Sequence, residues 1–209
     1  MRKIVLAAAL GATVAAMPAA AQEYAPFTGA RVEALIGYDN IKDGGDGNSD
    51  GRDGVTYGAL LGYDFQVGGL VVGAEGEVTD SSVSARSVNN FVPGDQLRLD
   101  AGRDLYIGGR VGYAISPVAL LYAKGGYTNA RIESRYTTTT TGTGGTTVVT
   151  TVNDRDDLDG FRLGAGMEYK ISPSAFVKGE YRYSHYGKLD GVDIDLDRHQ
   201  LMAGVGIRF

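Results

Sequence analysis

Charged side chains recur at alternate positions in several stretches of the chain. Both signs are present, in Arg31, Glu33, Glu75, Glu77, Arg110, Lys124, Arg162, Glu168, Lys178, Glu180 and Arg182. Inside a barrel such residues can pair and keep some water, whereas a cation on a lipid-facing surface near the bilayer midplane costs about 2 to 4 kcal/mol. These residues can either form salt bridges that fill the interior of a barrel, which we call a plug, or line a pathway for ions. Because eight strands enclose little more than the volume of their own side chains, we favour the plug.

Acidic loops are the candidates for a metal site. The segment Asp46–Gly51 matches the first half of a calcium-binding EF-hand loop, but the twelfth position holds Tyr57 instead of a bidentate glutamate. We interpret the segment as a solvated turn and leave calcium binding open. The cluster of Asp190, Asp193, Asp195 and Asp197 allows the same weaker hypothesis. We expect no cofactor.

Neither of the two histidines is expected to be catalytic. Ser184 and His185 are adjacent on a predicted strand and therefore point to opposite faces. A nucleophile and its base must instead lie within hydrogen-bonding reach. His199 has the parity of an outward-facing residue at a membrane interface. A lipid-modifying barrel would need an apolar interior to hold a lipid tail, whereas the interior predicted here is charged. We expect no enzymatic activity.

Eight segments must position these residues, and each alternates apolar and polar side chains with the period of two that is typical of strands. They cover residues 28–39, 55–65, 70–78, 104–115, 121–127, 161–170, 177–183 and 200–209. Many run to about ten residues, which is longer than is usual in soluble sheets and matches a tilted strand that crosses a bilayer.

The connections between these segments alternate in length. Tight ones lie near 66–69, 116–117 and 172–173, and long polar ones near 40–53, 80–103, 131–157 and 187–197. This asymmetry is typical of outer-membrane barrels, which have short periplasmic turns and long external loops. The Thr-rich run from Thr137 to Thr151 is expected to extend its two strands outward as a hairpin. Its tip is either an adhesive surface or a plain solvated loop.

Aromatic residues with outward parity fall at two heights. Tyr63, Phe65, Tyr113, Tyr169 and Phe209 lie near the turns, and Tyr38, Tyr57, Tyr127, Phe161, Tyr181 and Tyr183 lie near the long loops. Two such belts are expected where a barrel meets the two membrane interfaces. The alternative is an exported soluble barrel with scattered tyrosines.

The N-terminus has the pattern of a secretory signal peptide, with Arg2 and Lys3 before a short apolar run and an Ala-x-Ala site. We therefore predict a signal peptide over residues 1–21 and a barrel domain over 22–209. Removing residues 1–21 changes the formal net charge from −5 to −7, which argues against nucleic-acid binding. The chain has no cysteine, so neither a disulfide nor a thiolate metal site is available.

Three motifs carry a resemblance to a known family. They are Gly109–Tyr113, Leu121–Tyr127 and Val205–Phe209. With them the segment 22–209 resembles the outer membrane protein β-barrel domain family, the small porin-like and opacity-type surface antigens of Gram-negative bacteria. The resemblance implies that the barrel-assembly machinery reads a terminal aromatic strand, here Leu201, Ala203, Val205, Ile207 and Phe209.

We thus predict an all-β fold, an eight-stranded antiparallel up-and-down transmembrane β-barrel in the outer membrane of a Gram-negative cell. The expected function is a structural, membrane-integrity or surface-interaction role through the external loops. The alternative is a narrow porin-like channel for ions or small solutes. The expected partners are outer-membrane lipid and lipopolysaccharide, the assembly machinery, and an external ligand or host surface, with a monomer favoured and no nucleic acid.

Overall fold

The computed structural model describes residues 25–43, 52–88, 95–141, 147–187 and 196–209. The predicted signal peptide and the Asp46–Gly51 loop lie outside these residues, as do Asp190, Asp193 and Asp195. The described residues form nine strands: β1 (Gly29–Asp43), β2 (Arg52–Val67), β3 (Leu70–Ser81), β4 (Ser84–Val88), β5 (Gln96–Ser116), β6 (Ala119–Thr141), β7 (Thr147–Lys170), β8 (Ala175–Gly187) and β9 (Leu196–Arg208). Among these residues, no helix has the length and apolar character needed to cross a membrane.

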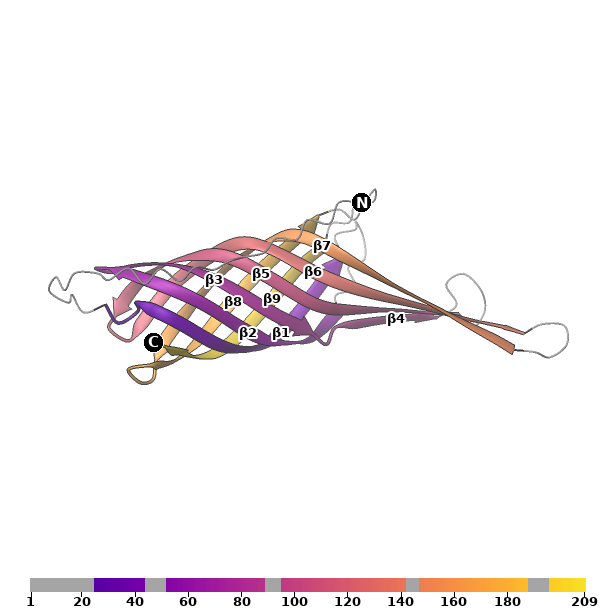
Figure 1. The fold of residues 1–209 in the computed structure, drawn as a ribbon, viewed down its shortest axis with the longest axis horizontal. Coiled ribbons are helices and arrows are strands. Elements are labelled where there is room, and N and C mark those ends of the chain that lie inside the picture. Colours follow the sequence, from indigo (N-terminus) through magenta and orange to yellow (C-terminus); the bar gives the residue numbers. More distant parts are fainter. Residues whose placement is uncertain (1–24, 44–51, 89–94, 142–146, 188–195) are drawn as a thin grey trace, which may run out of the picture.

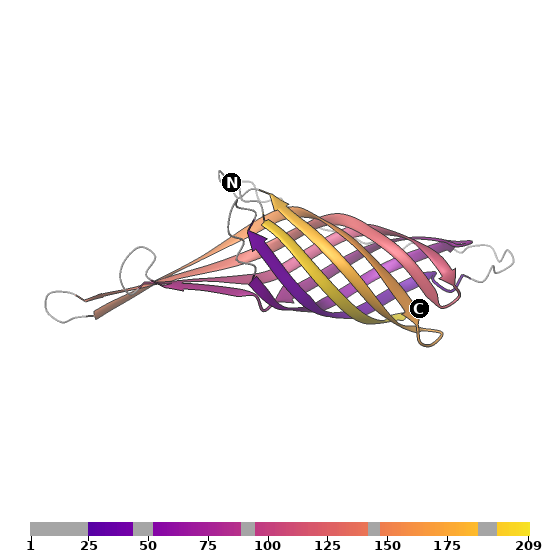
Figure 2. The same ribbon diagram turned by 180° about the vertical axis from the view of Figure 1, so that it is seen from behind.

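Eight of the strands close into a barrel (Figures 1 and 2). Neighbouring strands of the wall pair antiparallel; β3 pairs with β5, and β1 pairs with β9 to close the barrel. Strand β4 stands outside this wall and pairs with the beginning of β5. The closed, up-and-down antiparallel barrel of eight strands is confirmed.

The wall of the barrel has its polarity reversed relative to a soluble protein. On the outward face Ile107 is 68% exposed and Leu61 63%, whereas the inward Arg162 is completely buried. A charged interior behind an apolar exterior is the arrangement of a barrel that stands in lipid. The predicted parity of the strands is confirmed.

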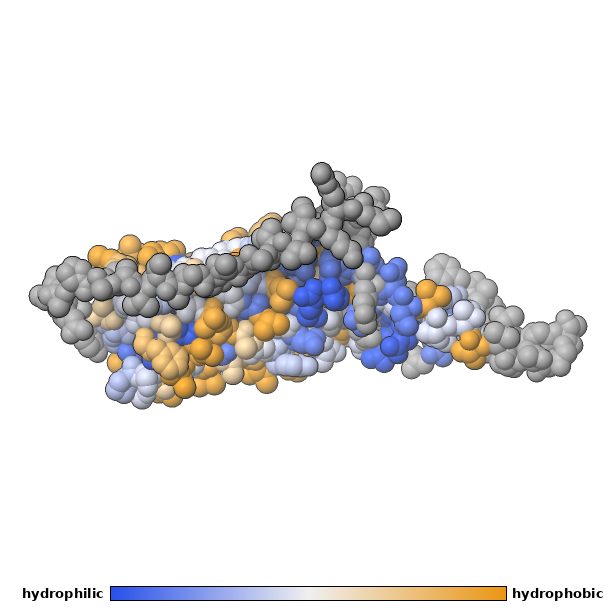
Figure 3. Space-filling view, viewed as in Figure 1, coloured by the Kyte–Doolittle hydropathy of each residue, from blue (hydrophilic) through white to orange (hydrophobic). Residues whose placement is uncertain are grey.

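Aromatic side chains mark both ends of the apolar band. Tyr63, Phe65, Tyr113, Tyr169 and Phe209 are exposed near the short turns, and Tyr38, Tyr57, Tyr127, Phe161 and Tyr181 are exposed toward the other end. Figure 3 shows the hydrophobic residues gathered over the barrel and hydrophilic ones where the longest strands leave it. We call these two levels the turn-side girdle and the outer girdle.

Three strands continue beyond the barrel wall and form, together with β4, a long sheet that we call the arm. It consists of β4, residues 96–101 of β5, 131–141 of β6 and 147–157 of β7 (Figure 1). The pairing of β6 with β7 runs without a break out to Thr141 and Thr147, so the predicted Thr-rich hairpin is confirmed. The long loops predicted over 80–103 and 131–157 are wrong for most of their length. The β-branched threonines and valines there favour an extended sheet over a loop.

The turn end is closed by residues that precede β1. Phe27 is fully buried against Val71 and Leu120, its N–H donates to Gln66 Oε1 (3.0 Å), and its carbonyl accepts from Arg208 Nη1 (2.7 Å). The adjoining β2–β3 turn places Gly68 at φ +59°, a conformation that favours glycine. The barrel therefore carries an ordered cap at this end.

Candidate functional site in the barrel interior

The barrel interior holds equal numbers of opposite charges. Among the described residues its buried members are the eight carboxylates Glu33, Asp39, Asp64, Glu75, Glu77, Asp104, Glu168 and Glu180, and the eight cations Arg31, Arg110, Lys124, Arg162, Lys178, Arg182, Arg198 and Arg208. The alternation of the strands places them there, because every second side chain points inward. Such a set can exist away from water only if its members pair with one another.

Near the turn end, two carboxylates and two arginines form a closed ring. Arg110 contacts Asp64 (Nε to Oδ1, 2.8 Å) and Glu168 (Nη2 to Oε2, 3.1 Å). Arg208 contacts the same two carboxylates, at 2.5 Å and 2.7 Å. The four residues come from β2, β5, β7 and β9, every second strand of the wall, so the ring crosses the whole lumen. Arg31 adds a further contact to Asp64 at 3.1 Å.

A second cluster fills the centre of the lumen. Lys124 Nζ lies 2.6 Å from Glu75 Oε1 and 3.2 Å from Glu180 Oε1. Arg182 pairs with both Glu180 and Glu77. Glu77 on β3 and Arg182 on β8 stand four strands apart in either direction around the barrel, so this pair spans its diameter.

A third cluster lies toward the arm. Asp104 accepts hydrogen bonds from Thr128 Oγ1 (2.6 Å), Tyr186 OH (2.9 Å) and Arg198 Nη1 (2.9 Å), and it also pairs with Arg162. Arg198 contacts Asp39 as well, with Nε to Oδ1 at 2.8 Å. Asp104 and Arg198 come from β5 and β9, which also face each other across the barrel.

The structure places all eleven of the predicted interior charges inside the barrel, and every one of them has at least one ion pair. Five of the sixteen interior charges are not among these eleven: Asp39, Asp64, Asp104, Arg198 and Arg208. Each has the inward parity of its strand neighbours. Asp39, Asp104 and Arg198 lie next to segments that the sequence predicts as long loops. The predicted terminal strand is β9, on which Leu201, Val205 and Ile207 face outward. Phe209 follows directly after it and is 78% exposed.

The histidines lie on the outside of the barrel. Ser184 is buried and accepts a hydrogen bond from Arg162 Nε (2.8 Å), whereas His185 points outward, with Nδ1 3.0 Å from Asp197 Oδ1. His199 Nδ1 lies 2.7 Å from the Tyr181 hydroxyl in the outer girdle. The predicted opposite orientation of Ser184 and His185 is confirmed. Among the residues that the structure describes, no group of three or more histidine, aspartate or glutamate side chains could hold a metal ion.

The geometry shows that the interior carboxylates are paired with cations. Several of them contact two or more cations, and removing one partner of a buried pair costs about 3 to 5 kcal/mol because the other charge is left uncompensated. Replacing both members of a pair by apolar groups can, by contrast, leave the folding free energy unchanged. The clusters thus fix the side chains across the lumen without adding much net stability.

Comparison with known proteins agrees with this architecture. The family model described as outer membrane protein beta-barrel domain matches residues 6–209. The chain is 26% identical over 166 residues to the 31 kDa outer-membrane immunogenic protein of Brucella melitensis, covering 75% of this chain and 67% of that protein. It is 28% identical over 162 residues to the 25 kDa outer-membrane immunogenic protein of Brucella abortus, covering 73% of this chain and 64% of that one. The crystal structure of Neisserial surface protein A superposes with a TM-score of 0.52 at 16% identity, covering 87% of this chain and 98% of the other.

Proposed function

Because the chain belongs to the outer membrane protein beta-barrel domain family, we propose that it is a closed barrel with a structural and surface-interaction role, exerted through the arm and not through the lumen. It is an outer-membrane β-barrel surface protein of a Gram-negative cell, like its relatives. The arm then stands outside the cell, and the short turns face the periplasm.

The observation that carries the proposal is the set of ion pairs that cross the lumen. The ring of Asp64, Arg110, Glu168 and Arg208 closes one level, and the Glu77–Arg182 and Asp104–Arg198 pairs join opposite walls at two others. A solute would have to separate these pairs in turn. Leaving even one charge unpaired costs about 3 to 5 kcal/mol, which is a high barrier to repeated passage.

The relatives support a surface role. Two of them are named immunogenic outer-membrane proteins, which fits a chain whose longest strands project from the membrane. An external ligand or host surface would meet the arm first. A monomer suffices for this role, because the barrel closes on itself without an edge in its wall.

The ends of the chain complete the proposal. Residues 1–21 act as a cleaved signal peptide, and residues 22–209 form the mature barrel domain. Leu201, Ala203, Val205, Ile207 and Phe209 are read by the barrel-assembly machinery. In support, four of these residues are exposed on the outward face of β9 and Phe209 is exposed directly after it, where a partner outside the barrel can reach them.

Conductance in planar bilayers tests the closed barrel. Purified protein is expected to give no reproducible unitary steps in bilayers where a general porin, as the positive control, does. The variant with Glu77→Gln and Arg182→Gln loses one negative and one positive charge, so the net charge of the lumen is unchanged. It tests whether any current passes through the lumen. Stable steps of the native protein whose size changes in this variant would place the current in the lumen. They would favour the narrow channel instead.

A further inference from the structure

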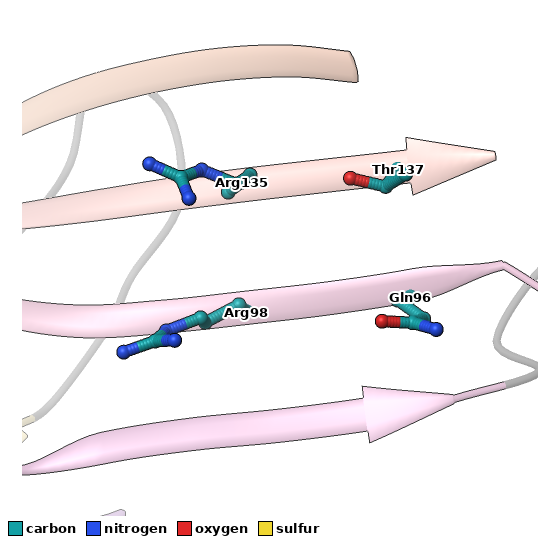
Figure 4. A pocket seen from close by; sticks show the side chains of 4 residues that line it. All are labelled: Gln96, Arg98, Arg135 and Thr137. Atoms are coloured by element: carbon teal, nitrogen blue, oxygen red, sulfur yellow. The ribbon is translucent and has the colours of Figure 1, made fainter. Parts of the chain in front are cut away.

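Strand β7 lies at an open edge of the arm. Figure 4 shows the four strands of the arm side by side, with β5 and β6 in the middle, marked by Arg98 and Arg135, and with β4 and β7 at the two edges. Among the residues that the structure describes, β7 pairs only with β6 from Thr147 to Leu158, because its pairing with β8 ends at Asp159. Such an edge presents a row of backbone N–H and C=O groups with which another strand can pair.

The far part of this edge has the composition of a strand that pairs readily. Residues 147–153, which we call the β7 edge, are three threonines, three valines and one asparagine. Val149 and Val152 are exposed. A segment of about six or seven residues with high β-propensity, no charge and no proline pairs with other strands when it is left exposed. Natural proteins protect such edges with charged residues or proline, but on β7 the charged residues begin only at Asp154.

The neighbouring connection is too short to cover the β7 edge. Residues 188–195 join β8 to β9, and half of such a connection spans at most about 13 Å. Asn153 lies about 20 Å along β7 from Asp159, where the pairing with β8 ends. The described part of the chain thus leaves the β7 edge to a strand of another molecule.

The direction of β7 and its charged residues select the way in which a second copy of the chain would pair. Toward the barrel the β7 edge continues as Asp154–Asp157, which contains three acids and one arginine. Two copies side by side in one membrane have β7 running in the same direction, so in register each acid stands beside its own copy, which weakens the pairing.

Two copies that face each other from opposing membranes run antiparallel, the more stable arrangement per residue. With Thr150 opposite Thr150 of the second copy, Thr147 lies opposite Asn153 and Val148 opposite Val152. Every residue of the paired stretch is then uncharged, and residues 154–157 lie outside it. The β7 edge is therefore complementary to itself in the antiparallel direction.

We propose that the β7 edge pairs antiparallel with the β7 edge of a second copy of this chain in a facing outer membrane, so that the arm joins one cell to another. A pair of short strands is weak on its own, so the contact holds cells together only through many copies at once. In its own membrane the barrel remains a monomer. The inference rests on the proposed function only in that the arm must lie outside the cell.

Clustering of whole cells tests the pairing. The full-length protein is expressed in a Gram-negative host whose lipopolysaccharide has no O-antigen, because that polysaccharide would hold the arms apart. Expressing cells carry one fluorescent label, and cells without the protein carry another. We expect clusters that contain only expressing cells, since both sides must supply a β7 edge. An absence of clusters, or clusters that take up both kinds of cell equally, would overturn the proposal, and the second result would assign the arm to a different ligand on the cell surface.

Charge at Thr150 gives the sharpest variants, because Thr150 is exposed and lies opposite itself in the antiparallel pair. Cells with Thr150→Lys should lose clustering, and so should cells with Thr150→Glu, because like charges then meet. A mixture of these two kinds of cell should cluster again, with both kinds in each cluster, because lysine then meets glutamate. The matched variant Ser84→Lys places the same charge on β4, at the opposite edge of the arm, and should cluster like the native protein.

Two outcomes with the variants would contradict the pairing. They are unchanged clustering of the Thr150→Lys cells, and a mixture of the lysine and glutamate cells that does not cluster. Heat-modifiable gel migration verifies that each variant is folded, and cleavage of the arm by protease added to intact cells verifies that it lies outside. Because bilayer conductance reports on the lumen and clustering on the arm, either proposal can fail without the other.

Discussion

Replacing Asp104 by asparagine removes the charge at the centre of the outermost interior cluster while keeping the shape of the side chain. The carboxylate pairs with Arg162 and Arg198 and accepts from two hydroxyl groups. Breaking a buried pair from one side costs about 3 to 5 kcal/mol. In the variant, Arg198 remains paired with Asp39, and Arg162 remains paired with Glu77 at 3.3 Å. We therefore expect the free energy of unfolding to fall by about 2 to 4 kcal/mol.

The free energy of unfolding can be measured by urea titration of the protein in lipid vesicles. The chain has no tryptophan, so far-UV circular dichroism and gel migration report the transition. Asp156→Asn, at an exposed position on the arm, is the matched control and should change stability by less than about 0.5 kcal/mol.

A double-mutant cycle of Asp104→Asn with Arg198→Met isolates the pair that spans the barrel. We expect a coupling energy of at least about 1 kcal/mol, because the second substitution removes one of the charges that the first leaves unpaired. A loss below about 1 kcal/mol for Asp104→Asn, together with a coupling near zero, would refute the interpretation of the interior as a tightly paired network.

Three further predictions concern the outside of the barrel. Leu61→Arg introduces a cation on the lipid-facing surface, where Leu61 is 63% exposed, and should cost about 2 to 4 kcal/mol of folding free energy in vesicles, whereas Leu61→Ala should cost much less. The hydrogen bonds from Arg131 lower the pKa of the Asp157 carboxyl, so the stability that this pair gives the arm is present above the ordinary carboxyl pKa and is lost as the pH falls through the lowered value. Arg131→Gln should raise that pKa in an NMR titration, and an unchanged value would contradict the pairing. Deleting Phe209 should reduce assembly in cells more than refolding into detergent, whereas equal losses in both assays would count against its role as an assembly signal.

Much of the fold could be predicted from the alternation of residues along the chain. In β1, for example, Arg31 and Glu33 alternate with Val32 and Ala34, and the alternation gives both the strand and its two faces. The short turns are equally local, because Gly68 supplies the positive φ at one of them. The interior position of the eleven predicted charges follows from the same parity.

The extent of the strands was not predictable in this way. Residues 131–141 and 147–157 are mostly polar, and Val149 and Val152 among them are exposed, so no burial pattern separates a solvated sheet from a loop. Only the observed pairing of β6 with β7 shows that the sheet continues and that β7 lies at its edge.

By itself, then, the sequence determined which residues form the strands of the barrel wall, which face of each of these strands meets lipid and which end of the barrel has short turns. The tertiary structure alone decided which charge meets which. Arg182 pairs with Glu77, which is 105 residues away in the sequence, and Arg198 pairs with Asp39, which is 159 residues away. The physical reason is that side-chain alternation fixes only inside or outside. Partners across the lumen depend on the strand order, register and tilt of the closed barrel, which no local pattern encodes.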